Sequence, residues 1–151
     1  MLPMTNVDSD NSDLFDGFRN GSHHLWVVCE PNWRPYDGGD ARYLELDFHA
    51  TDWEALFRDM LGCPAYDLNQ TKERNRELFH QSIPDFPMLG EIFDNYEDYS
   101  YHGHDLERLR NECHLLQSRA TDATASKALR KLIYACDEAT NAGCALMLVC
   151  D

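Results

Sequence analysis

The sequence predicts an α+β fold in which a small, mostly antiparallel sheet carries about five helices. Two strand-like segments stand near the beginning of the chain and a third ends it. Between them, apolar residues recur at helical spacing. Because the strands do not alternate with helices, a doubly wound parallel sheet is not expected. The predicted sheet is an N-terminal strand pair joined by the C-terminal strand.

The composition indicates one globular domain with a large negative charge. The chain has 151 residues, of which 43% are hydrophobic, and its formal net charge is −14. A charge of this size repels nucleic acid and anionic membranes and favours a basic protein partner. Residues 1–22 are rich in Asp, Asn, Ser and Gly. We therefore expect a flexible acidic leader over 1–22 and a single α+β domain over 23–151.

The cysteines and the N-terminus favour a reducing, cytoplasmic location. No two of the six cysteines form a CxxC pair. Four of them occupy apolar contexts, where a free thiol acts as a small hydrophobe: Cys29, Cys113, Cys136 and Cys144. The start MLPMTNVDSDNSD has neither the basic region nor the apolar core of a signal peptide. No apolar run reaches the roughly 18 residues that span a membrane.

Three segments are predicted to form the sheet. His24 to Glu30 is mostly apolar, and Tyr43 to His49 alternates between apolar and polar residues. Ala145 to Cys150 is a continuous apolar run, expected to dock as a buried strand beside the first two. Trp33 and Tyr36 lie in the long loop between the first two strands. They are candidates for a binding surface, and the alternative is that they fold back over the sheet edge.

Capping and proline signals predict the first two helices. Thr51 as N-cap and Glu54 three residues later form a capping box, so a helix should run from there to about Leu61. A second helix, KERNRELFHQSI, follows Thr71 and ends before Pro84.

Helical spacing of apolar residues predicts three further helices. The first opens at Asp85 and is expected to stop near Ser100 or Gly103. The other two cover about Asp105 to Arg119 and about Asp122 to Ala142.

Residues 91–107, EIFDNYEDYSYHGHDLE, form an acidic aromatic segment that contains no Lys or Arg. Carboxylates accept paired hydrogen bonds from arginine, while aromatic rings supply contact area and cation–π faces. Helical spacing assigns Ile92, Phe93 and Tyr96 to the core. The residues predicted to contact a partner are Asp94, Glu97, Asp98, Tyr99 and Tyr101, with Trp33 and Tyr36 as second anchors. The alternative is an ordinary solvated helix face.

The motif HGHD makes His102 and His104 weak candidates for metal ligands, because alternate histidines on an extended segment point the same way. A third ligand such as His114 would have to come from elsewhere. The neighbouring carboxylates favour the protonated imidazolium, which works against metal binding. No GxSxG, P-loop or GxGxxG motif occurs. We therefore assign no catalytic residue and no cofactor, and expect a protein that is not an enzyme.

Two resemblances extend this interpretation. Residues 84–151 contain PMLGEIFDNYEDYSYHGHDLERLRNECHLL, a helix ending EATNAG, and the final apolar strand with Asp151. This part of the chain resembles a family of small uncharacterised bacterial proteins. In size and acidity the chain is also similar to the immunity proteins of bacterial toxin systems.

The second resemblance implies a non-enzymatic cytoplasmic binding protein that inhibits a basic toxin or another cationic protein. It transfers no individual functional residue. The alternatives are a metal-binding protein or metal-dependent enzyme using His102 and His104, and a self-associating structural or regulatory subunit. The oligomeric state, monomer or homodimer, stays open.

Overall fold

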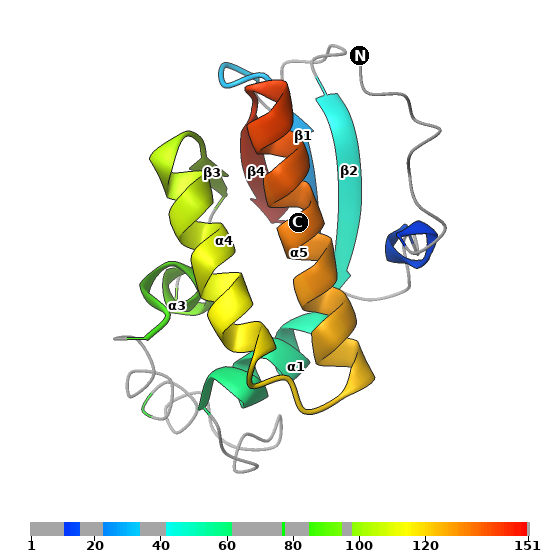
Figure 1. Ribbon diagram of the computed structural model, residues 1–151, viewed down its shortest axis with the longest axis vertical. Helices are drawn as coiled ribbons and strands as arrows, with labels where there is room; N and C mark the ends of the chain where they lie inside the picture. The colour runs from blue at the N-terminus through cyan, green and yellow to red at the C-terminus, as the bar shows by residue number, and fades with distance from the viewer. Residues whose placement is uncertain are drawn as a thin grey trace.

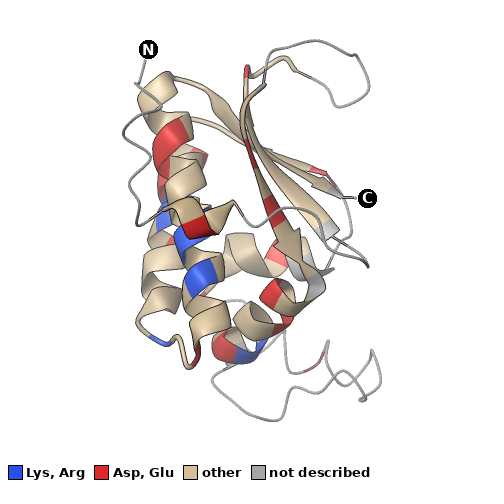
Figure 2. Ribbon diagram, turned by 90° about the vertical axis from the view of Figure 1, so that its right-hand side faces the viewer, with Lys and Arg blue, Asp and Glu red and all other residues tan. Residues whose placement is uncertain are grey.

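The computed structural model describes residues 11–15, 23–33, 42–61, 77, 85–94 and 98–150. Over these residues the fold is α+β: a four-stranded antiparallel sheet packs against a layer of helices (Figure 1). The predicted fold class is thus confirmed. Figure 2, turned by 90°, shows the sheet nearly edge-on with the helices gathered on one side of it.

The sheet has the strand order β2-β1-β4-β3, and every neighbouring pair is antiparallel. Its strands are β1 (His23–Cys29), β2 (Arg42–His49), β3 (Tyr99–Tyr101) and β4 (Ala145–Cys150). The C-terminal strand lies beside β1, as its apolar run predicts. Cys29 of β1 is in register with Ala145 of β4. The end of β1 and the beginning of β4 therefore lie at the same end of the sheet.

Strand β3 corrects one expectation. The sequence predicted a helix continuing to Ser100 or Gly103, but the helix ends at Asp94, and Tyr99 to Tyr101 pair with β4. The pairing places Tyr101 opposite Leu146. Tyrosine fits a pleated, half-buried surface well, and β4 offers a free edge for it. Tertiary pairing overrides the helical pattern here.

The helices are α1 (Ala50–Leu61), α3 (Pro87–Asp94), α4 (His104–Gln117) and α5 (Ala123–Ala142). Helices α4 and α5 lie side by side across the sheet, α1 crosses near one end of α5, and α3 lies against α4 (Figure 1). The predicted helix KERNRELFHQSI lies outside the described residues except for Glu77, which is helical. No described helix is long and apolar enough to cross a membrane.

Local chemistry explains where the helices begin and end. The α1 capping box is displaced from Thr51 and Glu54: the backbone N–H of His49 donates to Asp52 Oδ2 at 2.9 Å. Asp52 thus takes the position that the sequence had assigned to Glu54. Helix α5 ends in a Schellman motif at Gly143, whose φ of 65° suits glycine.

The main core lies between the sheet and the helices. It contains the inward residues of the strands, among them Trp26, Phe48 and Leu148, and the apolar stripes of helices α1, α3, α4 and α5. Leu14, within the predicted leader of residues 1–22, is fully buried in this core. The four cysteines predicted in apolar contexts are free and buried: Cys29, Cys113, Cys136 and Cys144.

Candidate functional site

The acidic aromatic segment is divided among three elements: the end of α3, strand β3 and the start of α4. Glu91, Asp98 and Glu107 are exposed, one near each of these elements. Glu97, Tyr96 and Tyr36 lie outside the described residues, as do the side chains of Asp94 and Phe93. Ile92 is buried, as predicted. We call Glu91, Asp98 and Glu107 the acidic surface.

The two tyrosines of β3 belong to the core side of the sheet. Tyr101 is only 6% exposed, so the expectation that its side chain lies on the surface is wrong. Burial raises the pKa of its hydroxyl well above the ordinary value. Tyr99 is half-buried, and its hydroxyl donates to the carbonyl oxygen of Glu91 at 3.1 Å. Strand alternation turns both rings inward and leaves Ser100 exposed.

Trp33 follows the alternative stated for it. Its side chain is half-buried and packs on the second face of the sheet, against the cluster of Val27, Cys29 and Met147. Its backbone N–H donates to the carbonyl of Glu30 at 3.0 Å, which closes a tight turn after β1. Trp33 therefore covers the sheet, and most of its ring is not offered to a partner.

The two histidines of HGHD are exposed, at the turn between β3 and α4. His104 Nδ1 lies 3.5 Å from Glu107 Oε2, one helical turn away. Among the described residues, no group of three His, Cys, Asp or Glu side chains could hold a metal ion. The third ligand that the metal hypothesis requires is therefore not supplied by this part of the chain.

A pocket of about 280 Å³ opens where three turns meet at one end of the sheet. Its walls come from the exit of β1 (Pro31), the β3–α4 turn (His102, Gly103) and the α5–β4 turn (Gly143, Cys144). The remaining lining comes from the facing helices and consists of Leu106, Ala139 and Thr140. Its lining is mostly apolar, and no sequence motif announces it because its walls are far apart in the chain.

The residue before the pocket residue Pro31 forms a hydrogen bond to strand β2. Glu30, next to Pro31, is exposed and accepts a hydrogen bond of 2.6 Å from the Tyr43 hydroxyl. The pKa of Cys144, on the pocket wall, is raised first by burial and then by the charge of Glu30. Glu30 itself is not among the residues that line the pocket.

Every arginine whose side chain the structure describes forms an ion pair with an aspartate. The pairs are Arg58–Asp122, Arg108–Asp105, Arg110–Asp137, Arg119–Asp85 and Arg130–Asp13. In the view of Figure 2 the cationic residues lie in the helical layer. These cations are thus already partnered within the fold. The exposed Glu91 and Glu107 have no ion pair with any of them.

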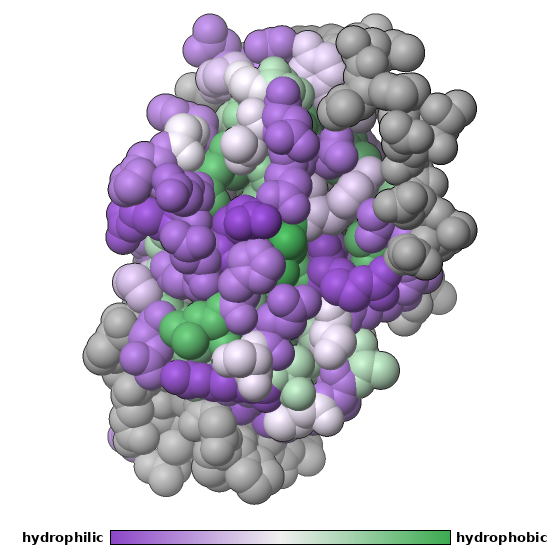
Figure 3. Space-filling view, in the orientation of Figure 1, coloured by the Kyte–Doolittle hydropathy of each residue, from purple (hydrophilic) through white to green (hydrophobic). Residues whose placement is uncertain are grey.

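The face formed by the helices is mostly hydrophilic, with a few separated hydrophobic spots (Figure 3). Leu115 of α4 is one exposed apolar side chain, at 43%. Scattered single apolar residues are normal on a protein surface. The helical face therefore offers no large apolar patch to a partner, and its main feature is its charged and polar side chains.

Three buried polar residues, which the sequence analysis did not identify, connect neighbouring elements of the fold through hydrogen bonds. Glu112 of α4 accepts hydrogen bonds from the backbone N–H groups of Met88, at 3.0 and 3.1 Å, and Leu89, at 3.1 Å. It thereby caps the N-terminus of α3. Its position was readable, since Glu112 lies three residues after Leu109 and so falls on the buried face of α4.

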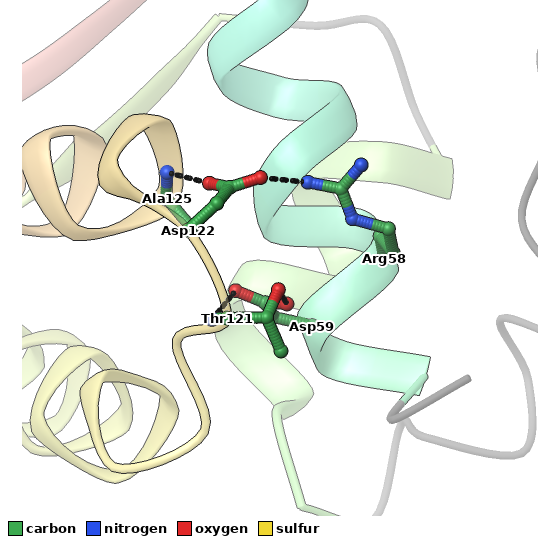
Figure 4. A network of polar contacts seen from close by, with 5 residues as sticks. All are labelled: Arg58, Asp59, Thr121, Asp122 and Ala125. Atoms are coloured by element: carbon green, nitrogen blue, oxygen red, sulfur yellow. Dashed lines mark hydrogen bonds and ion pairs between the residues drawn. The ribbon is translucent and has the colours of Figure 1, made fainter. Parts of the chain in front are cut away.

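The other two hold α5 in place. Asp59 of α1 accepts hydrogen bonds from the Thr121 backbone N–H at 3.2 Å and hydroxyl at 2.6 Å (Figure 4). Beside it, Asp122 pairs with Arg58 and caps α5 through the Ala125 N–H at 2.8 Å. Lys131 of α5 is fully buried, and its Nζ donates to the Asp47 carbonyl at 2.8 Å.

Comparison with protein-family models, curated proteins and solved structures found no match to this chain. The function therefore has to be inferred from the charge and geometry described above.

Proposed function

We propose that the protein is a non-enzymatic, cytoplasmic binding protein for a basic protein, of the immunity type that inhibits a bacterial toxin. The observation that carries the proposal is the ion pairing of the arginines. Each described arginine side chain is bound to an aspartate. Glu91, Asp98 and Glu107 are exposed, and the described arginines form no ion pair with Glu91 or Glu107. With 27 acidic against 13 basic residues in the chain, a strong negative field remains.

Such a field steers a cationic protein toward the molecule before any contact forms. Hydrogen bonds connect the elements that carry the acidic surface. Tyr99 ties β3 to the carbonyl of Glu91, and Glu112 ties α3 to α4. Acids held on packed elements lose little conformational freedom on binding, so more of the interaction energy appears as affinity.

The test uses the product of the neighbouring gene as the candidate partner, because toxin and immunity genes stand side by side. The association rate constant of the two purified proteins is measured by stopped-flow at several salt concentrations. We expect it to fall by about tenfold or more from low to physiological salt. Coexpression should also relieve any growth arrest caused by the partner.

Charge-neutral variants locate the contact. Glu91→Gln with Asp98→Asn should lower the association rate constant, and adding Glu107→Gln should lower it further. The matched control is Glu45→Gln, which removes one exposed acid from β2, at the opposite edge of the sheet. A rate that is indifferent both to salt and to these substitutions would contradict the proposal.

A further inference from the structure

Strand β3 forms one edge of the sheet, and β2 forms the other (Figure 1). One side of β3 pairs with β4, and no strand of the described residues pairs with its other side. The outer side of an edge strand presents backbone N–H and C=O groups that can pair with another chain. Hydrogen bonds at the opposite edge of the sheet determine which groups β3 presents.

At β2, the backbone groups of Asp47 and His49 point away from β1. The Asp47 carbonyl accepts a hydrogen bond from Lys131 Nζ at 2.8 Å, and the His49 N–H donates to Asp52 at 2.9 Å. In an antiparallel strand the N–H and C=O of one residue point to the same side, and successive residues alternate. Leu25 lies opposite Asp47, so its backbone groups turn away from β2 and toward β4.

The same alternation continues across the sheet to β3. Leu25 is in register with Val149, so these two residues form a hydrogen-bonded pair. The next residue back along β4, Leu148, turns its backbone groups toward β3, where it lies opposite Tyr99. Ser100 therefore directs its N–H and C=O outward, away from β4. Ser100 is exposed, and no described backbone group outside the sheet forms a hydrogen bond with it.

The surroundings of this edge favour a basic chain. Asp98, directly before β3, is exposed, and exposed Glu91 is tied to β3 through the Tyr99 hydroxyl at 3.1 Å. Residues 91–107 contain no Lys or Arg. Opposite charges on neighbouring strands stabilise the pairing, whereas like charges oppose it. A second copy of this chain would bring a further charge of −14 to the same acids, so self-pairing is disfavoured.

We propose that β3 binds an extended basic segment of the partner as a fifth strand of the sheet, an inference that rests on the proposed function. Hydrogen bonds with the Ser100 backbone set the register of the segment, and Lys or Arg side chains lie near Asp98 and Glu91. In strand addition the main-chain hydrogen bonds supply affinity and the side chains supply specificity. The acids thus speed association, and the strand pairing slows dissociation.

The first test needs no partner. Hydrogen exchange of the free, full ¹⁵N-labelled chain is followed by NMR. We expect the Ser100 amide to exchange rapidly, and the Tyr99 and Tyr101 amides, which face β4, to exchange slowly. A Ser100 amide that is already protected in the free chain would overturn the outward orientation on which the inference depends.

A peptide then serves as the probe. N-acetyl-Lys-Val-Lys-Val-Lys-amide should shift the β3 amides saturably and slow exchange at Ser100. The same peptide N-methylated at every residue keeps its charge but loses its backbone donors, and it should do neither. A peptide with glutamate in place of lysine should also have no effect. Equal shifts with the N-methylated or the glutamate peptide would overturn the inference.

Ser100→Pro tests the edge in the protein itself. Proline removes the outward N–H, and edge strands tolerate it where that group faces solvent. The variant should lose the peptide shifts and release the partner at least about fivefold faster, with the association rate constant nearly unchanged. Ser100→Ala keeps the N–H and is the matched control, which should bind as the wild type does. If Ser100→Pro fails to fold, the N-methylated peptide decides, because it leaves the protein unaltered.

These measurements separate this inference from the proposed function. If folded Ser100→Pro releases the partner at the wild-type rate while acid neutralisation still slows association, only the strand inference fails. If the peptide pairs with β3 but association ignores salt and the acidic surface, the proposed function fails instead. Light scattering adds a further outcome. A wild-type dimer that Ser100→Pro converts to a monomer would assign this edge to a second copy and overturn the inference.

Discussion

Replacement of Glu112 tests how the acidic surface is held in place. Glu112 is 9% exposed, and its carboxylate accepts hydrogen bonds from two backbone N–H groups at the N-terminus of α3, those of Met88 and Leu89. In Glu112→Ala both donors lose their partner while they remain buried. Each buried donor left unsatisfied costs about 1–3 kcal/mol. Part of this loss is offset, because the unfavourable desolvation of the carboxylate also disappears. We expect a net destabilisation of about 2–4 kcal/mol.

Glu112→Gln is the informative partner variant. Its Oε1 still accepts from Met88 and Leu89, while its amide group cannot replace the second contact of Oε2 with Met88. We therefore expect a loss of about 1 kcal/mol or less at neutral pH. The exposed Glu107→Gln on the same helix is the control and should change stability by less than about 0.5 kcal/mol.

The pH dependence gives an independent check. The pKa of Glu112 is raised from its ordinary value of 4.5, chiefly by burial, while the Met88 and Leu89 N–H groups and the charge of Arg108 lower it. Because the folded pKa lies above the unfolded one, the stability contributed by this group is present below pH 4.5 and is lost as the pH rises through the raised pKa. Relative to the wild type, Glu112→Gln should therefore gain stability as the pH rises from about 4.5.

The assay is urea unfolding followed by tryptophan fluorescence and circular dichroism, with coincident transitions as the test for two-state behaviour. Thermal scans should show a fall of roughly 5–15 °C for Glu112→Ala. Hydrogen exchange of the Met88 and Leu89 amides should accelerate in the same variant. Wild-type stability in Glu112→Ala, with unchanged exchange of these amides, would refute the role assigned to Glu112.

Three further predictions follow from the other supports. Asp59→Ala should destabilise the protein by about 1–3 kcal/mol in urea unfolding, because Thr121 loses two hydrogen bonds. The control Thr121→Ser keeps both hydrogen bonds and should be nearly neutral. Gly143→Ala should lower the free energy of unfolding by about 1 kcal/mol. The loss comes from the φ of 65° alone, because an added Cβ meets no atom within 4 Å. An unchanged melting temperature would contradict this prediction. Burial raises the pKa of Cys113 well above its ordinary value and that of Cys136 to about 12, so both thiols should react with Ellman's reagent in urea and resist it in buffer.

The parts of the fold that were predicted are those whose signals are local. The apolar run of Ala145 to Cys150 predicted β4, and the helical spacing from about Asp122 to Ala142 predicted α5 within a residue. Strand β3 was missed because Tyr-Ser-Tyr is too short to show a period of its own. Its existence depends on the free edge of β4, which is a tertiary fact. Assigning Tyr101 by helical phase then placed a buried ring on the surface.

In the candidate site, too, local features were predictable from the sequence and tertiary ones were not. Exposed acids can be predicted from a segment that lacks Lys and Arg: Asp98 is exposed as expected, whereas Glu91 is exposed although it was not among the residues predicted to contact a partner. The pocket could not be read, because its walls come from turns that only the strand register brings together. Cys29 pairs with Ala145, and Tyr101 pairs with Leu146, so the exits of β1 and β3 and the entry of β4 coincide. A one-residue slip of β4 would separate those walls.

If the acidic surface binds the proposed partner, the same register would link recognition to stability. Strand β3 is short, and its pairing with β4 extends over three residues. It is held further by Tyr99, which donates to the Glu91 carbonyl, and by the packing of Tyr101 in the core. Glu112 fixes α3 to α4 on the other side of the same segment. The region that carries the acidic surface is therefore held by a short strand pairing together with the side-chain hydrogen bonds of Tyr99 and Glu112. Replacing Glu112, which is buried, should therefore weaken binding of the proposed partner by disordering the exposed acids.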